Sequence, residues 1–501
     1  MKKLTDYYAK HPLRLILFVA FLLRMLSVIF AKGYGMHDDH FTIIETSRSW
    51  AEGWDFQGWL QTTPQGHSFT YPLLMFCLFK ILMFFGIESL DIQMYFVRFL
   101  HAVLSLLTIY FSHKIVFRTT NEKQSANLSA WILAVLWCMP WLSVRNLVEI
   151  VCMPFLVWAT WLYIRNQNPR IKDVILSGVV MGIGLAFRYQ LLFFIGGFGL
   201  AMLIYKQWKN AIIWSLAVVI TFSLTQLSDI FIWHKPFVEM QEYFVYNLTT
   251  EDIYPHGGLF KYIGVLSGML IPPASVLLLF GFLYGYKRLL LFLPSFCFLF
   301  FHSIFPNKQE RFIFPVIPFI VLSGVIGCRD FALKRAISYK LRRIVKICCI
   351  ISLVLNFILL IPVTVHYSKR ARVESMVYMY SYRPQVKLFI HEDSPHHDYE
   401  KMPKIYTVQN CEQVNITSDT VDINNLNLTE QPAFIMFAEQ TDIERRVENM
   451  RKYFPNLEYA TTVHTSFIDE LMRKINHHNH NYSFVIYRNN DVINNEQYNS
   501  K

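Results

Sequence analysis

The sequence predicts an all-α membrane protein with about eleven to twelve transmembrane helices and a small C-terminal α/β domain outside the membrane. The chain is 53% hydrophobic and only 17% charged, whereas soluble domains carry roughly a quarter charged residues. Its apolar residues form long runs that short basic clusters separate. After about residue 367 the sequence becomes polar.

Eleven apolar segments approach the roughly 20 residues that a helix needs to cross a bilayer. They lie at residues 13–31, 93–116, 127–142, 147–164, 173–187, 191–206, 210–231, 262–286, 289–305, 312–328 and 346–366. The first follows a basic N-terminus, as in a signal peptide, but no small-residue cleavage pattern leads from it into a soluble domain. We therefore expect an uncleaved first span.

The basic residues predict the orientation of these segments. With the N-terminus inside, the inner loops carry most of the clustered cations, as membrane proteins prefer. These cations are Arg118, Lys123, Arg165, Arg170, Lys172, Lys206, Lys209, Lys287, Arg288, Arg329, Lys334, Arg335, Lys340, Arg342, Arg343 and Lys346. A full crossing at 71–86 would invert every later loop, so we expect a re-entrant or shallow element there. The net charge of +11 thus reflects membrane orientation, and nucleic acid is not an expected partner.

Two domains are expected. Residues 1–367 form the transmembrane domain, whose first outer loop spans 32–70, and residues 368–501 form an extracytoplasmic α/β domain. In the second domain, strand-like runs at 404–408, 433–437 and 483–487 alternate with helical patterning at 441–452 and 467–474. Such alternation is typical of a small α/β fold.

The first outer loop begins with the sequence His37-Asp38-Asp39-His40. One of its carboxylates is suited to act as a general base at the membrane interface. The alternative is a solvated polar loop that ends a helix. A metal site is a third interpretation, which the rarity of adjacent residues converging on one ion disfavours.

A second charged loop contains Lys308, Glu310 and Arg311 between two apolar segments, on the predicted outer side. Cations are disfavoured on that side, so an anionic ligand such as a phosphate is the simplest reason for their presence. The alternative is that Glu310 pairs with Lys308 or Arg311 and only caps the spans.

Further charges lie at the same predicted edge, in Arg145, Glu149 and Arg188. Each alone could be a snorkelling or paired structural residue. With Lys308 and Arg311 they place four cations on one face, which favours an anion site. The outer loop that follows Asp229 is rich in aromatic, amide and histidine groups, including Asn247 and His256. These groups suit sugar binding, although an interfacial aromatic belt is an equally good explanation.

In this order the motifs resemble those of GT-C fold glycosyltransferases. Within that class they are similar to the dolichyl-phosphomannose-dependent mannosyltransferases of GPI-anchor and lipid-linked N-glycan assembly. The resemblance covers about residues 13–328. The family shows a His-Pro-Asp-Glu-like motif after the first span, in which Asp39 takes the Asp position while Asp38 and His40 replace Pro and Glu.

Three later stretches carry the rest of the resemblance. Arg145 to Glu149 is similar to an Arg-Thr-x-Ser-Asn-x-x-Glu-like stretch, and Asp229 to Asn247 is similar to an Asp-x-x-Tyr-Gly…Asn pattern. Residues 307–312 resemble a His-Lys-Glu-x-Arg-Phe motif in which Asn307 and Gln309 replace His and Glu. These departures indicate a divergent member and leave both the sugar and the acceptor open.

The resemblance implies an inverting transfer of a sugar, mannose first of all, from a polyprenyl-phosphate donor to a glycan or lipid-linked glycan acceptor. Asp39 would be the catalytic base, with Asp38 as its substitute. The donor phosphate would be bound by Lys308 and Arg311, with Arg145 and Arg188 as secondary candidates. The expected substrate-binding residues are His37, His40, Glu149, Asp229, Asn247, His256 and Glu310.

No metal or cofactor is required by this scheme, because cations held in place can stabilise the leaving phosphate. The enzyme would be a multi-pass protein with its site on the periplasmic face of a bacterial inner membrane or the luminal face of the endoplasmic reticulum. Two alternatives stay open: a transferase of another sugar, of the aminoarabinose or protein O-glycosylation type, and a lipid-linked glycan transporter. A transporter often shows inverted repeats, and none is found.

Overall fold

The computed structural model describes residues 8–36, 39–56, 58–60, 63–250, 256–335, 338–393, 402–417, 428, 430–476 and 481–493. The chain forms two compact units. The helical unit comprises Met1–Ala31 and Gln57–Val365, and the sheet unit comprises Lys32–Phe56 and His366–Lys501. Residues 32–56, which the sequence analysis assigned to the transmembrane domain, are thus grouped with the C-terminal part. The division into a transmembrane domain of residues 1–367 and an extracytoplasmic domain of residues 368–501 stays a prediction.

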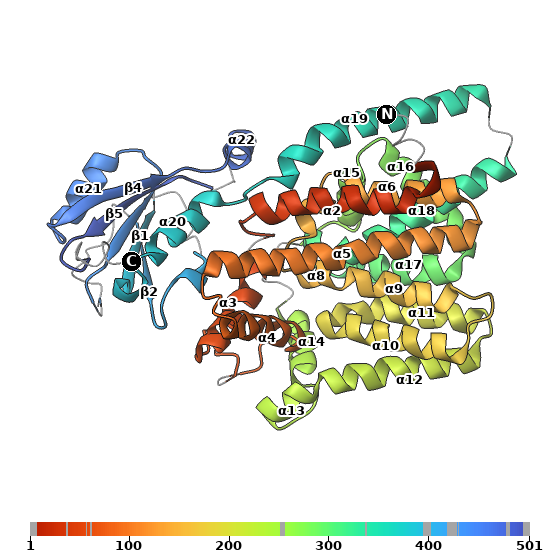
Figure 1. Ribbon diagram of the computed structural model, residues 1–501, viewed down its shortest axis with the longest axis horizontal. Coiled ribbons are helices and arrows are strands. Elements are labelled where there is room, and N and C mark those ends of the chain that lie inside the picture. Colours follow the sequence, from red (N-terminus) through yellow and green to blue (C-terminus); the bar gives the residue numbers. More distant parts are fainter. Residues whose placement is uncertain are drawn as a thin grey trace. The chain divides into compact units, whose positions relative to one another are not determined.

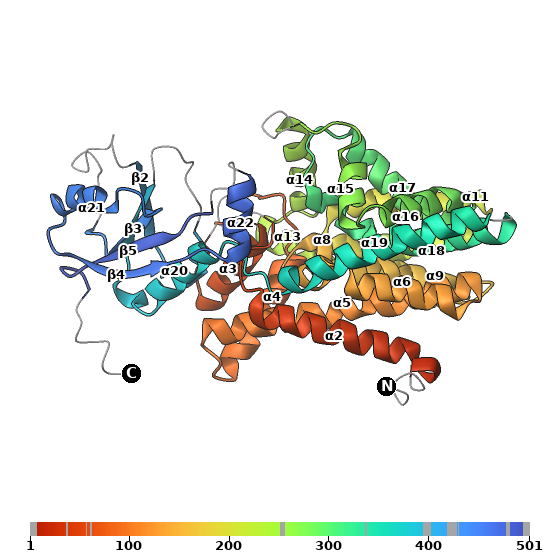
Figure 2. The same ribbon diagram turned by 90° about the horizontal axis from the view of Figure 1, so that it is seen from above.

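The helical unit is built of helices, many of which run roughly parallel to one another (Figures 1 and 2). Its elements are α2 Pro12–Phe30, α4 Thr70–Phe84, α5 Leu90–Thr120, α6 Lys123–Val135, α7 Met139–Leu142, α8 Val148–Val151, α9 Met153–Ile164, α10 Ile171–Phe187, η1 Tyr189–Leu191, α11 Leu192–Ile204, α12 Trp208–Thr225, α13 Leu227–Trp233, α14 Val238–Thr249, α15 Lys261–Met269, α16 Ala274–Tyr284, η3 Gly285–Lys287, α17 Leu289–Ile304, η4 Glu310–Val316, α18 Ile317–Lys334 and α19 Tyr339–Thr364. Close packing of α16 on α18 depends on glycine, because a Cβ at Gly327 would lie 1.8 Å from the Gly281 carbonyl oxygen. Small residues of this kind let helix backbones approach each other in membranes.

Within the described residues, five helices are long and apolar enough to cross a membrane: Pro12–Phe30, Leu90–Thr120, Trp208–Trp233, Glu310–Lys334 and Tyr339–Thr364. The helix pair Lys261–Met269 and Ala274–Lys287, bent by 120°, would make a sixth. Shorter apolar helices are Thr70–Phe84, Val148–Ile164, Tyr189–Ile204 and Leu289–Ile304. These findings confirm a multi-pass, all-α membrane protein. The number of eleven to twelve spans and the re-entrant character of 71–86 stay predictions.

Basic side chains gather at one end of the helical unit, which we call the basic end. A cavity of about 740 Å³ lies there and is lined by Arg118, Lys287, Arg288, Asp330 and Lys334, among others. Asn166, Gln167 and Pro169, shortly before α10, also line this cavity. The 17 residues of α10 then rise about 25 Å at 1.5 Å per residue. Arg188, directly after α10, therefore lies at the opposite end of the helical unit.

The sheet unit contains a five-stranded sheet with the strand order β2-β1-β3-β5-β4. Strand β1 pairs in parallel with β2 and β3, whereas β5 pairs antiparallel with β3 and β4. The elements are α3 Asp39–Glu52, α20 Arg370–Tyr380, η5 Arg383–Gln385, β1 Leu388–Asp393, η6 Lys404–Tyr406, β2 Glu412–Thr417, β3 Phe434–Ala438, α21 Ile443–Arg451, β4 Leu457–Val463, α22 Phe467–Ile475 and β5 Phe484–Asn489. The predicted small α/β domain is confirmed. The strand predicted at 404–408 is wrong, because a 3-10 turn occupies that segment.

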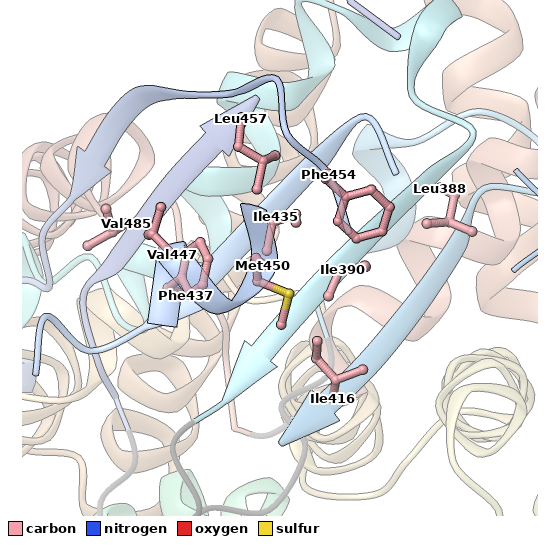
Figure 3. Close-up of a cluster of buried hydrophobic side chains, with 10 residues drawn as sticks. All are labelled: Leu388, Ile390, Ile416, Ile435, Phe437, Val447, Met450, Phe454, Leu457 and Val485. Carbon is pink, nitrogen blue, oxygen red and sulfur yellow. The ribbon is translucent and has the colours of Figure 1, made fainter. Parts of the chain in front are cut away.

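One face of the sheet carries an apolar core (Figure 3). Val447, Met450 and Phe454, from α21 and the turn after it, pack on side chains of the strands such as Ile390 and Ile435. Since these side chains recur at helical spacing on α21 and on one face of each strand, they account for the layering of helix on sheet.

Helix α3 is held on the C-terminal part of the sheet unit by contacts distant in sequence. The Arg383 guanidinium donates to both Glu52 carboxylate oxygens at 2.7 and 2.8 Å. The backbone N–H of Ile405 donates to Glu45 at 3.3 Å. Before α3, the Tyr34 N–H donates to the Ser368 carbonyl at 3.3 Å. The helix that carries Asp39 is therefore positioned by residues more than 300 positions away.

The substitution Gly33→Ala should disrupt this attachment. A Cβ at Gly33 would lie 1.8 Å from the Ser368 carbonyl oxygen, and overpacking of this kind typically costs about 1–3 kcal/mol. We expect a lower thermal unfolding temperature. Gly199→Ala is the matched control, because no atom lies within 4 Å of its added Cβ. An unchanged unfolding temperature in Gly33→Ala would contradict the packing described.

Candidate functional site

A buried carboxylate between two arginines lies at the end of the helical unit opposite the basic end. Glu149 Oε1 is 3.2 Å from Arg188 Nη1 and 3.4 Å from Arg311 Nη1. The side chains of Glu149, Arg188 and Arg311 are only 2%, 4% and 13% exposed. With two cations and one anion, this triad carries a net charge of +1. We call these three residues the Arg–Glu–Arg triad.

Breaks in the helices bring the triad together. Pro140 and Pro154 stand in the first turns of α7 and α9, where proline is tolerated but cannot continue a preceding helix. The short α8 between them carries Glu149. Arg188 has an extended backbone conformation between α10 and η1, and Arg311 lies in η4. Each charged side chain thus comes from a non-helical junction or a very short helix.

Two glutamines orient the arginines of the triad. Arg188 Nε donates to Gln190 Oε1 at 2.8 Å, and Arg311 Nε donates to Gln309 Oε1 at 2.8 Å. Both guanidinium carbons lie 5.4 Å from the centre of the Phe312 ring. The guanidinium groups are therefore held in defined directions.

Lys308 makes a different contact from the one predicted. Its ammonium donates to the Gly257 carbonyl at 2.7 Å, while its own carbonyl accepts from Lys261 at 2.8 Å. Burial, and then the charge of Lys261, lower the pKa of Lys308. Glu310 pairs with Lys261 at 3.1 Å. Among the ion pairs described, Glu310 is thus joined to a residue that the sequence analysis did not name, and Arg311 is joined to Glu149.

The remaining candidates of the helical unit are dispersed. Arg145 is fully buried, with its guanidinium 4.0 Å from the Trp141 ring centre. Asp229 is buried and accepts the backbone N–H of Glu239 at 3.1 Å, near the start of α14. Asn247 donates to the Tyr243 carbonyl at 2.7 Å. These contacts position the surrounding loops.

His256 is exposed and forms an isolated β-bridge with Asn307. The loop that contains Lys308 and Glu310 is thereby joined to the end of the segment between α14 and α15. His256, Arg145, Asp229 and Asn247 stay predicted site residues.

The candidate acids of the first outer loop belong to the sheet unit. His37 and Asp38 lie outside the described residues, and of Asp39 only the backbone, which begins α3, is described. His40 is buried and its ring contacts that of Phe41 edge-on. Within the described ranges, no group of three or more His, Cys, Asp or Glu residues could hold a metal ion.

Sequence analysis missed Glu239, which binds the loop of residues 65–67 to α14. Its Oε2 accepts the backbone N–H groups of Gln65 and His67 at 3.0 and 3.1 Å, and its Oε1 accepts from Trp233 Nε1 at 2.9 Å. Burial raises the pKa of Glu239, although these hydrogen bonds oppose the shift. A lone acid within an aromatic-rich loop gives no motif by which it could have been found.

Two buried polar atoms near the triad are available to a ligand. Within the part of the chain that the structure describes, Glu149 Oε2 and His302 Nε2 have no hydrogen-bond partner. The His302 ring lies 6.3 Å from that of Phe312. A buried polar group without a partner destabilises the fold, so a hydroxyl-bearing ligand at these atoms would be favourable.

Comparison with known families identifies the class of protein. The model of the Alg9-like mannosyltransferase family matches residues 15–413. The chain belongs to this family. It is therefore a membrane glycosyltransferase, which confirms the predicted enzyme class and removes the transporter alternative. A search among curated proteins finds no similar sequence.

Solved structures share the fold of this family member. ArnT from Cupriavidus metallidurans bound to undecaprenyl phosphate aligns with a TM-score of 0.59 and 13% identity, over 94% of this chain and 97% of that one. The apo state of the same protein aligns with a TM-score of 0.57 and 11% identity, over 96% and 98%. At such low identity the likeness shows the fold alone, and it confirms the GT-C resemblance.

Arg311 of the triad affects the pKa of His67. His67 is an exposed residue, yet the protein around its imidazole, and then the charge of Arg311, lower its pKa from 6.5 to about 4. The unfolded chain binds this proton near pH 6.5 and the folded chain only near pH 4, so folding stability should fall as the pH drops through that window. Arg311→Gln should raise the pKa of His67 but leave it below 6.5, since burial is the larger cause.

NMR of the protein labelled in its histidines measures this pKa, with His67→Gln to assign the signal. Arg170→Gln, an exposed arginine next to α10 at the basic end, is the control and should leave the titration unchanged. A His67 pKa that does not respond to Arg311→Gln would show that the two groups are not electrostatically coupled.

Proposed function

We propose that this enzyme transfers a sugar, mannose first of all, from a polyprenyl-phosphate donor to a hydroxyl of a glycan or lipid-linked glycan, with inversion at the anomeric carbon. The observation that carries the proposal is the net positive charge of the buried Arg–Glu–Arg triad. Charged groups at a membrane edge are costly to bury, so an excess cation there favours an anionic ligand. A phosphate oxygen pair matches the planar fork of a guanidinium.

The chemistry assigns one task to the triad. The acceptor oxygen attacks the anomeric carbon while the bond from that carbon to the phosphate oxygen breaks, and the phosphate leaves with the electron pair. Negative charge therefore develops on the phosphate, and donors aimed at it in a low-dielectric site lower the barrier. Arg188 and Arg311, oriented by Gln190 and Gln309, would do this. Lys308 would add charge once its bond to Gly257 is exchanged for the phosphate.

The acceptor hydroxyl must lose a proton during the attack. Asp39 is our proposed base, because its carboxylate can accept that proton. It begins α3, and contacts of Glu45 and Glu52 with the C-terminal part of the sheet unit fix the position of this helix within the unit. Asp38 is its substitute. We propose that the carboxylate and the triad act on one donor molecule.

Two comparisons support the proposed donor and sugar. The aligned ArnT structure is described as bound to undecaprenyl phosphate, a polyprenyl phosphate. The family model is that of mannosyltransferases, which favours mannose over another sugar. We propose that such a lipid reaches the site from the membrane that the candidate spans of this chain cross.

Removal of a triad arginine should impair donor use. We expect Arg188→Gln and Arg311→Gln each to lower kcat/KM for the lipid donor by roughly 100- to 1,000-fold, the usual loss for one donor to a developing anion. Arg→Lys variants should be intermediate, since they keep the charge but lose the planar fork. The measurement is transfer from a radiolabelled polyprenyl-phosphate mannose in reconstituted vesicles.

Arg170→Gln serves as the matched control and should retain full turnover, because Arg170 is exposed next to the basic end. The thermal unfolding temperature of every variant shows whether it is folded. Folded Arg188→Gln and Arg311→Gln proteins with normal donor kinetics would exclude the triad as the phosphate site.

The substitution Asp39→Asn should abolish transfer while leaving the protein folded and inserted. An amide cannot accept the acceptor's proton, and general-base catalysis typically contributes roughly 100- to 10,000-fold. Donor binding should be unchanged, which separates this loss from that of the arginine variants. If Asp39→Asn and Asp38→Asn both kept wild-type turnover, neither carboxylate would be the base.

A further inference from the structure

Exposed apolar side chains in the sheet unit are concentrated on one helix, α22. Of the six large hydrophobic residues exposed within the described parts of this unit, four lie on α22, namely Phe467, Leu471, Met472 and Ile475. Phe467 is 79% exposed and Ile475 is 69% exposed. Single exposed apolar residues are ordinary, but a cluster marks an interaction surface.

Helix α22 turns its polar side toward its own domain. Asp469 is buried, and its backbone N–H and carboxylate are both bonded to the Ser466 hydroxyl that caps the helix. Arg473 pairs with Glu439, directly after β3, at 3.1 Å. The spacing of four residues places Phe467, Leu471 and Ile475 in one row on a different side of the helix.

This arrangement is the reverse of an ordinary surface helix, which buries its apolar stripe on the core and exposes its charges. Here the ion pair faces the domain and the apolar row does not. The sequence of α22 forms a strongly amphipathic helix, and the domain core does not use its apolar face. An apolar environment outside the domain core must therefore cover this face.

The contacts of Asp469 indicate what this apolar environment is. Its carboxylate lies 3.6 Å from His366 Nε2 and is bonded by the backbone of Lys369 and Arg370. The candidate span α19 ends at Thr364, two residues before His366. Two residues reach at most about 7 Å. The chain segment that contacts Asp469, residues 366–370, therefore follows directly on the end of this candidate span.

We propose that α22 is an interfacial anchor whose apolar face inserts into the lipid of the membrane leaflet at which α19 ends. Lys369 and Arg370 lie beside the helix through their backbone contacts with Asp469, and cations near such helices favour anionic membrane surfaces. Lys474, near the end of the helix, is paired with Glu470 at 2.9 Å. A second copy of the chain is disfavoured as the occupant, since nine residues offer far less area than a stable protein interface needs.

The anchor has a consequence that rests on the proposed function. Because α3 belongs to the same compact unit as α22, lipid insertion of α22 would hold Asp39 at a defined height above the bilayer. The anchor itself is independent of catalysis, so its test uses membrane depth and not turnover.

The test places an environment-sensitive fluorescent amino acid at position 471, in place of Leu471, in the full-length protein reconstituted in vesicles. Spin-labelled lipids with the quencher near the headgroup should quench it at least twofold more than the same probe in place of Glu448. Glu448 is the matched control, because it is an exposed residue of α21, another helix of the sheet unit. The Leu471 probe should also emit at a shorter wavelength than the control.

Equal quenching and equal emission of the two probes would overturn the proposal. So would quenching that depends on added polyprenyl phosphate, which would assign the face to the donor chain, or shielding that disappears when the protein is diluted in lipid, which would assign it to a second copy. Phe467→Asp adds a second measurement: it should reduce quenching of the Leu471 probe while leaving the unfolding temperature unchanged, since Phe467 packs on little else.

Discussion

The arrangement at the proposed donor site depends on one electrostatic constraint, a carboxylate buried between two guanidinium groups. Removing three charges from water is unfavourable unless they are paired, and breaking such a group usually destabilises a protein strongly. One carboxylate can compensate only one of the two cations. Glu149 therefore makes the burial of Arg188 and Arg311 tolerable and still leaves a site for a further anion. A fully neutralised group would hold the helices equally well but would not attract a phosphate.

This constraint explains the irregular backbone around the site. A continuous helix through residues 139–164 would place Glu149 along a span, whereas the breaks at Pro140 and Pro154 place it in a short helix at the end of the bundle. Backbone of this kind at a membrane edge is tolerated where it is buried in protein. The same holds for the extended residue Arg188 and the 3-10 helix that contains Arg311.

Much of the fold was predictable, because segments that cross a membrane must be apolar and can therefore be recognised in the sequence. The apolar segments, the basic end, the helices α21 and α22 of the C-terminal part and two of its strands followed from local sequence, whereas α20 was not predicted. The charged members of the triad were also recognised, since cations on the predicted outer side are unusual. Their pairing was not, because it depends on tertiary contacts. Arg311 pairs with Glu149, 162 residues away, and among the ion pairs described the adjacent Glu310 pairs with Lys261.

Other features lay beyond sequence reasoning for the same reason. Residues 32–56 join the sheet unit through contacts such as Glu52 with Arg383, 331 residues apart, which no local pattern reveals. The position of α22 was predicted, but the direction of its apolar face follows only from the burial of Asp469 and the pairing of Arg473. Local sequence thus predicted the candidate functional residues more reliably than it predicted their tertiary contacts.

The central claim is that the triad binds the donor phosphate, and a structure of the enzyme with a bound polyprenyl phosphate tests it most directly. The account predicts the phosphate within hydrogen-bonding distance of both Arg188 and Arg311, with the Asp39 carboxylate on the opposite side of the anomeric carbon in a donor complex. A phosphate bound in the cavity at the basic end, or one that contacts neither arginine, would contradict it.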